Sequence, residues 1–172
     1  MAEQVMWAGR FVTAVRDGQW EYVRRSRGIR AVVILAETDA GEILLVEQQR
    51  VPIGGKCLEL PAGLIGDEAG GAEDSIEAAA ARELVEETGY RPGAVERLGD
   101  YYSSPGMISE SFTLVRATGL ERVGEGGGVD GEEIVVHHVP RDEVVRFIAA
   151  RRATGIGIDA KLLLLSSPSI AC

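Results

Sequence analysis

Three glutamates, Glu83, Glu86 and Glu87, have the type and the spacing to bind a metal ion. Positions three and four apart on a helix face the same side, so the three carboxylates would project together. Like charges this close repel one another unless a cation lies among them. Mg²⁺ prefers carboxylate oxygens and commonly binds together with phosphate groups. The cluster therefore indicates a metal site for phosphate chemistry, and the alternative that spacing leaves open is a solvated acidic helix face.

Composition excludes several other kinds of chemistry. The chain has 27 acidic against 18 basic residues and a net charge of -9, which argues against a nucleic-acid partner because phosphate contacts need a basic surface. Cys57 and Cys172 are too few for a disulfide scaffold or a zinc site. His137 and His138 alternate on a predicted strand, so at most one faces inward, and we expect no chemical role for them or for Cys57. No apolar run approaches the ~20 residues of a membrane helix and no signal peptide opens the chain, so we expect no membrane partner and a cytoplasmic location.

The elements that must position the glutamates alternate between strands and a few helices. Asp17-Gly18 separates predicted strands 7–16 and 19–25 as a hairpin turn. The remaining predicted strands cover residues 29–37, 42–48, 57–60, 95–102, 111–118 and 133–139, and the predicted helices cover 74–88, 141–152 and 159–165. With 172 residues the chain can bury a sizeable core. This order favours an α/β sandwich or an α+β domain over a regular βαβ array.

The helix that carries the glutamates has signals at both ends. Asp74 or Ser75 can cap its N-terminus, and Gly89 supplies its C-terminal stop. Ile76, Ala80 and Leu84 recur every four residues and predict its buried stripe. Arg82 precedes Glu86 by four positions, so this spacing predicts that it holds that carboxylate. Farther along, five glycines in residues 124–131 predict a mobile acidic loop.

The segment around this helix resembles the Nudix box, G-x5-E-x7-R-E-U-x-E-E-x-G-U, in which U is a bulky apolar residue. The second half of the box is matched in order by Arg82, Glu83, Leu84, Glu86, Glu87, Gly89 and Tyr90. The first half departs from the pattern, because Asp74 replaces its glutamate and ten residues rather than five follow Gly63 before that position. The resemblance implies an α+β fold: an α/β/α sandwich of the Nudix type with a mixed central sheet, flanking helices and an N-terminal antiparallel hairpin.

Segments outside the box resemble the ADP-ribose pyrophosphatase branch of this family. They are Val46–Arg50, Glu59–Gly63, Ser103–Gly106 with Glu110 beyond it, and Asp159–Lys161. In that branch a proline about 15 residues after the box is a substrate signature, and Pro105 occupies this position. The resemblance divides the chain into residues 1–28, an N-terminal hairpin that builds a homodimer, and residues 29–172, the catalytic domain.

Metal ligands follow from the box. The resemblance implies that Glu83 and Glu87 bind Mg²⁺, with Mn²⁺ as a substitute. The carbonyl of Ala62 would complete the coordination, although a tight turn after a strand explains the same sequence. Glu86 would be a further catalytic carboxylate, as a ligand or as the partner of Arg82.

The branch also needs a carboxylate from a loop after the sheet strands, which binds a further metal ion or deprotonates water. Glu132 is the first candidate for both roles, Glu133 is the second, and Glu110 competes with them because it follows the Ser-Pro-Gly loop. Ordinary loop acidity is the alternative explanation for each of these residues. Clustered Mg²⁺ ions can activate the attacking water and neutralise the leaving phosphate.

Substrate-binding residues are implied at four positions. Arg50 would bind a phosphate, because the guanidinium fork matches phosphate oxygens; a surface salt bridge is its alternative. Trp20 would stack on the nucleobase across a dimer interface, unless it only fills the core or the interface. Pro105 and Gly106 would contribute the loop of the substrate signature.

The resemblance implies a Mg²⁺-dependent hydrolase that cuts ADP-ribose into AMP and ribose 5-phosphate. The first alternative is another nucleoside diphosphate sugar, such as GDP-mannose. A hydrolase of nucleoside triphosphates fits less well, because the N-terminal hairpin and the Ser-Pro-Gly loop are not expected there. A domain that senses ADP-ribose without cutting it would show degenerate box carboxylates, whereas Glu83, Glu86 and Glu87 are all present.

Overall fold

The computed structural model describes residues 2–26, 29–65, 75–129 and 131–166. The strands and helices run, in chain order, as β1 (Gln4–Ala8), β2 (Val12–Asp17), β3 (Trp20–Arg25), β4 (Arg30–Ala36), β5 (Glu42–Arg50), the 3₁₀ helix η1 (Val51–Ile53), β6 (Gly55–Glu59), β7 (Ala62–Ile65), α1 (Ile76–Thr88), β8 (Tyr90–Arg91), β9 (Ala94–Tyr102), β10 (Ser111–Thr118), β11 (Glu121–Arg122), β12 (Val135–Pro140), the 3₁₀ helix η3 (Arg141–Glu143), α2 (Val144–Ala153), β13 (Gly157–Ile158) and the 3₁₀ helix η4 (Ala160–Ser166).

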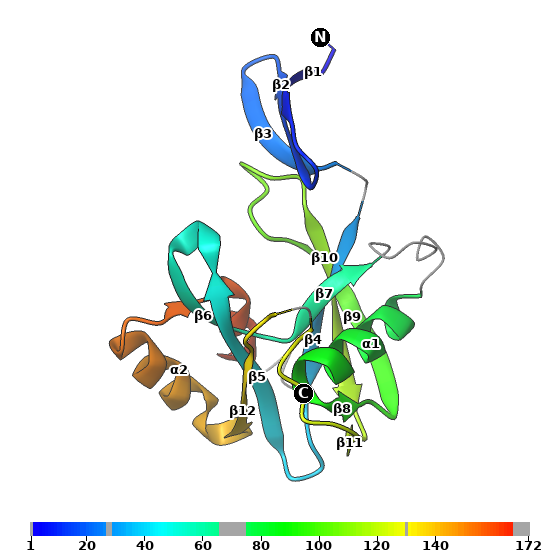
Figure 1. Cartoon of the computed structure of the whole chain (residues 1–172), viewed down its shortest axis with the longest axis vertical. Coiled ribbons are helices and arrows are strands. Elements are labelled where there is room, and N and C mark those ends of the chain that lie inside the picture. The colour runs from blue at the N-terminus through cyan, green and yellow to red at the C-terminus, as the bar shows by residue number, and fades with distance from the viewer. Residues whose placement is uncertain (1, 27–28, 66–74, 130, 167–172) are drawn as a thin grey trace.

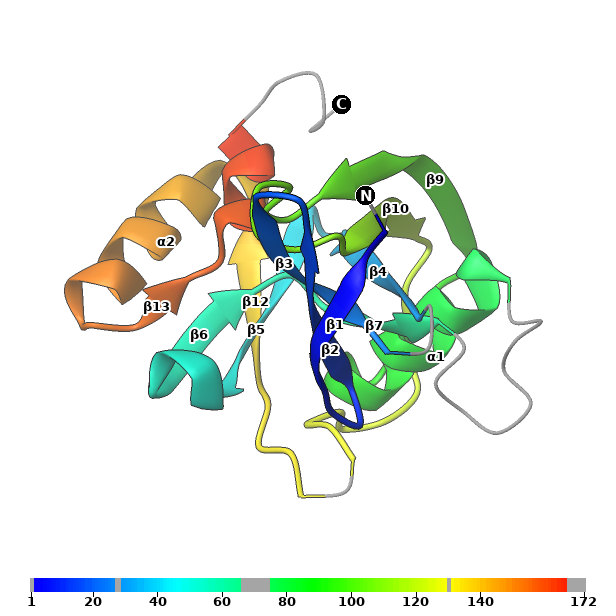
Figure 2. The same cartoon turned by 90° about the horizontal axis from the view of Figure 1, so that it is seen from above.

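Two mixed sheets form the centre of the molecule, and the helices cover them from outside (Figure 1). One sheet has the order β7-β4-β10-β9, in which only β4 and β10 are parallel; the other has the order β12-β5-β6-β13, in which only β6 and β13 are parallel. Seen from above, α1 and α2 again lie on opposite sides of the strands (Figure 2). The predicted α/β/α sandwich of the Nudix type is therefore confirmed.

Strand β4 is apolar at consecutive positions because both of its faces are buried in the core. Val33 and Leu35 face one cluster of buried side chains, which includes Leu58, Leu114 and Val144 of α2. The alternate β4 residues face a second cluster, which they build together with buried side chains of α1: Val32, Ile34, Ala36, Ala79, Ala80 and Leu84. A strand that is buried on both faces needs apolar residues at every position, and α1 is thereby fixed against β4 and β7.

The N-terminal segment differs from the predicted hairpin. It forms a three-stranded antiparallel sheet, β1-β2-β3, because the backbone turns at Gly9, whose N–H donates to the carbonyl of Val12 at 2.8 Å. The predicted strand 7–16 was therefore too long. This sheet stands at one end of the molecule in Figure 1 and meets the rest of the chain along residues 107–109.

Other boundaries shift less. Helix α1 begins at Ile76 and Ser75 is its N-cap, while Asp74 lies outside the described residues. The predicted helix 159–165 is the 3₁₀ helix η4, and the predicted helix 141–152 starts with the 3₁₀ turn η3 before α2. Strand β7 was missed, because its glycine and the glycine-rich stretch after it predict a loop. In the described part of the chain, no helix is long and apolar enough to cross a membrane.

Candidate active site

Helix α1 carries the glutamates, and its two ends are fixed locally. The hydroxyl of Ser75 accepts a hydrogen bond from the N–H of Ala78 at 3.1 Å, which satisfies one of the free donors of the first turn. Gly89 ends the helix with a φ of 77°, a left-handed conformation that glycine adopts without strain. Both expected end signals are confirmed. The helix therefore presents Glu83 and Glu87 toward strand β7.

The carboxylates of Glu83 and Glu87 lie close to the backbone of strand β7. The backbone N–H of Ala62 donates to Oε2 of Glu87 at 3.1 Å. A Cβ atom on Gly63 would lie 1.9 Å from Cδ of Glu83, so any larger residue would displace that carboxylate. Gly63, the first glycine of the box, is therefore required sterically, because a residue without a side chain lets helix α1 and the carboxylate of Glu83 approach the strand.

Arg82 contacts Glu83 and strand β7. Its Nη2 atom lies 3.2 Å from Oε1 of Glu83 and 3.3 Å from the carbonyl oxygen of Leu64 on β7. The arginine thus joins the box helix to the strand, and its contact with Glu86 stays a prediction.

Burial dominates the electrostatics of this cluster. Glu87 is only 6% exposed, and desolvation raises its pKa to about 8; the Ala62 N–H opposes this rise, and the charges of Glu83 and Glu132 add to it. Desolvation also raises the pKa of Glu83 above its ordinary value, against the effect of Arg82. A buried carboxylate that has one hydrogen bond and two acidic neighbours is favoured in its charged form when a cation binds nearby.

The donor set suits Mg²⁺, because Glu83, Glu87 and the carbonyl of Ala62 offer only oxygen atoms. Among the described residues, no three acidic, histidine or cysteine side chains already converge as a complete metal cluster. The fit therefore rests on the donor chemistry and on the burial of Glu87 beside two other acidic groups.

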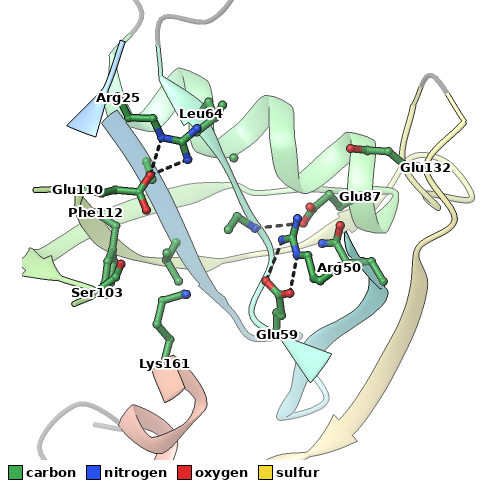
Figure 3. A pocket seen from close by; sticks show the side chains of 15 residues that line it. Arg25, Arg50, Glu59, Leu64, Glu87, Ser103, Glu110, Phe112, Glu132 and Lys161 are labelled. Carbon is green, nitrogen blue, oxygen red and sulfur yellow. Dashed lines mark hydrogen bonds and ion pairs between the residues drawn. The ribbon is translucent and has the colours of Figure 1, made fainter. Parts of the chain in front are cut away.

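A cavity of about 380 Å³ opens beside Glu87 (Figure 3). Arg50 points into it from the end of β5 and makes a two-pronged ion pair with Glu59 of β6, with N–O distances of 2.7 and 2.8 Å. Both carboxylate oxygens of Glu59 are thus used by one arginine, and the 7% exposed Glu59 side chain fixes the guanidinium. Arg50 therefore has a salt bridge and also a place in the cavity.

The glycine-rich loop is fastened to the end of α1. The N–H groups of Gly127 and Gly128 donate to the carbonyls of Glu87 and Glu86 at 2.9 and 3.1 Å, so they satisfy acceptors that the last helical turn leaves free. A Cβ atom on Gly126 would lie 2.4 Å from the backbone of Thr88, which explains a glycine there. This part of the loop is packed against the helix, contrary to the prediction that the whole segment is mobile.

The same loop places Glu132 in the cavity, on the side of Glu87 (Figure 3). The backbone N–H of Glu132 donates to the carbonyl of Val129 at 3.0 Å, and its carboxylate accepts from the N–H of Val129 at 3.4 Å. Glu133 is exposed and is not among the residues that line the cavity. Glu86 is half-buried on α1 and does not line the cavity either.

The competing carboxylate Glu110 also lines the cavity, but it is paired with an arginine. Nε and Nη2 of Arg25 lie 2.7 and 2.6 Å from Oε1 of Glu110. The structure thus brings Arg50, Ala62, Glu87, Glu110 and Glu132 around one space.

Trp20 lies elsewhere, with 67% of its surface exposed. It lines a second cavity of about 420 Å³ together with Tyr22, Pro105 and Gly106. Residues that the sequence predicts to contact the substrate therefore divide between two cavities of this chain.

Several residues that line the first cavity were not expected there from the sequence. They are Arg25, Gln48, Glu59, Ser103, Phe112 and Lys161. Gln48, Glu59, Ser103 and Lys161 belong to segments that carry the resemblance, which was the available signal. Lys161 pairs with Asp159, and its Nζ atom lies 5.7 Å from the centre of the Phe112 ring. Nothing in the sequence indicates Arg25, because only the folded chain brings it to the cavity.

The fold and the box helix define a Nudix protein, and comparison with known proteins agrees. The model of the NUDIX domain matches residues 27–156. The GDP-mannose pyrophosphatase of Cronobacter sakazakii is 35% identical over 81% of this chain and 72% of its own length. The chain therefore belongs to the Nudix hydrolase family.

One further relative and one solved structure are also similar to this chain. A methanol dehydrogenase activator of Bacillus methanolicus is 37% identical over 71% of this chain and 64% of its own length. A crystal structure of an ADP compounds hydrolase superposes with a TM-score of 0.72 over 96% of this chain and 90% of that chain, at 20% identity. At this identity the structural match supports the fold.

Proposed function

We propose that this protein is a Mg²⁺-dependent pyrophosphohydrolase of nucleoside diphosphate sugars, which releases a nucleoside monophosphate and a sugar phosphate. The observation that carries this proposal is the cavity in which the buried Glu87 faces Glu132, with Arg50 and Lys161 on its wall. It combines acidic groups for a divalent cation with basic groups for a diphosphate. The Cronobacter sakazakii relative is named as a GDP-mannose pyrophosphatase, which supports the substrate class.

Glu83, Glu87 and the carbonyl of Ala62 would hold the metal ion. When bound, Mg²⁺ neutralises phosphate charge and lowers the pKa of coordinated water. The backbone N–H of Ala62 keeps the carboxylate of Glu87 at the cavity before substrate arrives, and the close approach at Gly63 keeps Glu83 beside strand β7. Because the carboxylates are already in position, they need not move during the reaction, and such preorganisation favours catalysis.

Arg50 and Lys161 would bind the diphosphate. Glu59 fixes the fork of Arg50 through both of its oxygens, while 42% of the arginine side chain stays accessible to a ligand. Lys161 reaches the cavity from η4 and is oriented by Asp159. Two cations at different positions on the wall can contact different phosphates of one substrate.

Glu132 would accept the proton of the attacking water. The oxygen of that water forms a bond to one phosphorus, the bridging P–O bond breaks, and the other phosphate leaves with the bridging oxygen. Glu132 lies on a loop outside the box helix, so it need not serve as a metal ligand and can act as a base. Glu110 is less suited, because the guanidinium of Arg25 already occupies one of its carboxylate oxygens.

Two substrates have specific support. The residues outside the box favour ADP-ribose, whereas the similarity to the GDP-mannose pyrophosphatase of Cronobacter sakazakii favours GDP-mannose. The cavity that Trp20 shares with Pro105 fits a role in stacking a nucleobase, because an exposed indole offers a flat face to either purine.

We also propose that the N-terminal sheet builds a homodimer. Large apolar side chains are exposed there on one small sheet, and such a patch is typical of an interaction site. They include Val5, Met6, Trp7 and Phe11, each about half exposed. In the dimer, Trp20 would contribute to the site of the partner subunit.

A panel of nucleoside diphosphate sugars tests the proposed function. ADP-ribose, GDP-mannose and UDP-glucose are incubated with the enzyme and Mg²⁺, and the released mononucleotide is quantified, with a nucleoside triphosphate as the matched non-sugar control. We expect ADP-ribose or GDP-mannose to be hydrolysed fastest. Preference for the triphosphate, or no turnover of any sugar nucleotide, would contradict the proposal.

A further inference from the structure

Arg25 is the last residue of the N-terminal sheet and yet lines the cavity of the catalytic domain (Figure 3). Its guanidinium contacts Glu110 over a sequence separation of 85 residues. The ion pair is half-buried, with 28% and 23% of the two side chains exposed. It is thus partly withdrawn from solvent, where screening would weaken it.

Strand pairing explains how these residues meet. The N–H of Val23 donates to the carbonyl of Met107 at 2.9 Å, and the N–H of Ser109 donates to the carbonyl of Val23 at 3.0 Å, so Val23 and Ile108 form a parallel bridge. Side chains two positions farther along extended strands return to the same face. Arg25 and Glu110 are each two residues beyond this bridge, and the register therefore brings them together.

The geometry of the pair leaves half of the carboxylate available. Nε and Nη2 of Arg25 both lie within 2.7 Å of Oε1 of Glu110. The second oxygen points away from the guanidinium (Figure 3). A carboxylate oxygen accepts hydrogen bonds only, so its natural partner in a substrate is a hydroxyl group rather than a phosphate.

We propose that Arg25 is a positioning residue: it fixes Glu110 so that the free carboxylate oxygen accepts a hydrogen bond from a hydroxyl of the sugar nucleotide. This inference rests on the proposed function. It also assigns the N-terminal sheet a second role, because the register at Val23 determines where Arg25 lies. Substrate recognition is thereby coupled to the docking of that sheet.

Steady-state kinetics of Arg25→Met, Arg25→Lys, Glu110→Gln and the double variant Arg25→Met/Glu110→Gln test this inference, on whichever sugar nucleotide the wild type hydrolyses. The matched control is Arg24→Met, because Arg24 pairs with Glu3 at 3.3 Å and does not line the cavity. We expect Arg25→Met to raise KM about 10-fold and to change kcat less than about threefold, since a ground-state contact is lost. Arg25→Lys should recover part of this loss, because lysine keeps the charge but not the fork.

The double variant distinguishes positioning from a general effect on folding. If Arg25 acts through Glu110, the double variant should have about the KM of Glu110→Gln alone, because the two losses are not additive. A KM of Arg25→Met within about twofold of wild type, an effect confined to kcat, or multiplicative effects in the double variant would overturn the inference. If Arg25→Met does not fold, Arg25→Lys decides by the same KM criterion. Absence of turnover in the wild type would instead refute the proposed function, and this inference with it.

Discussion

The backbone N–H of Ala62 donates a hydrogen bond to the carboxylate of Glu87 at 3.1 Å, and this contact ties the acidic helix to the strand beside the cavity. It joins two positions 25 residues apart and explains why the Pro-Ala-Gly turn and the Nudix box occur together. The N–H faces a carboxylate that is 6% exposed, and the carbonyl of the same alanine remains a candidate metal ligand.

Glu83→Gln and Glu87→Gln should each lower turnover by at least about 100-fold, which corresponds to ~2.7 kcal/mol in the barrier. Each change removes a charged donor while it keeps the shape of the side chain. Calorimetry should also show weaker Mg²⁺ binding in both variants. Glu77→Gln is the matched control, since Glu77 is exposed on the same helix and should leave both measurements unchanged. Near-normal turnover of both site variants at saturating Mg²⁺ would refute the metal assignment.

Glu132→Gln should slow the single-turnover rate by about 100-fold while substrate affinity changes little, as expected for loss of a general base. Glu133→Gln is the neighbouring control and should stay within about threefold of wild type, because Glu133 lies outside the cavity. Glu110→Gln should affect the rate less than Glu132→Gln does. If Glu110→Gln is instead the variant with the lost rate, the base belongs to the Ser-Pro-Gly loop.

Trp20→Ala should raise KM about 10-fold with little change in kcat, because stacking on a base contributes ~1–3 kcal/mol. Tyr102→Ala is the control: its side chain is 65% exposed and lines neither cavity. An unchanged KM in Trp20→Ala would assign the indole to the interface between subunits or to the surface.

Deletion of residues 1–25 should produce a monomer and abolish activity together. The deletion removes the exposed apolar sheet, Trp20 and Arg25 in one step. Sedimentation velocity of both proteins, with activity measured on the same samples, gives the answer. An active monomeric truncation would exclude a shared site and leave the chemistry of the box helix unaffected.

The ion pair between Glu37 and Arg141 should make stability depend on acid pH. The hydrogen bond from Arg141 lowers the pKa of Glu37 below its ordinary value of 4.5. The stabilisation is therefore present above pH 4.5 and is lost as the pH falls through the lower folded-state pKa. We expect Glu37→Gln to cost ~1 kcal/mol at pH 7, about 3 °C in Tm, and less below pH 4. A Tm difference that persists unchanged at pH 3 would contradict this, and the exposed Glu121→Gln should show no difference at either pH.

The regular parts of the fold could be predicted because local signals agreed with them. Ser75, Gly89 and the repeat of Ala80 and Leu84 define α1 from the sequence, and the apolar run of β4 matches its burial on both faces. Strand β7 could not be predicted, because Gly63 reads as a loop residue. Its glycine is required by the approach of Glu83, a contact with a helix 20 residues away.

In the candidate site, too, some residues could be predicted from local sequence and others could not. Glu83 and Glu87 are indicated by spacing within one helix, and Glu132 by its place after a glycine-rich loop. The positions of Arg25 and Glu59 depend on strand register, which pairs Arg25 with Glu110, 85 positions away, and Glu59 with Arg50, nine positions away. The attachment of Gly127 and Gly128 to the end of α1 was also hidden, since the same glycines are typical of a mobile loop.

The most direct test of Mg²⁺-dependent hydrolysis is the release of mononucleotide from ADP-ribose and GDP-mannose, measured with Mg²⁺ and after its removal by a chelator. Wild-type protein should hydrolyse at least one of them only when Mg²⁺ is present, and Glu87→Gln should have less than about a hundredth of that rate. Equal rates in Mg²⁺ and chelator, or full activity of Glu87→Gln, would contradict the account.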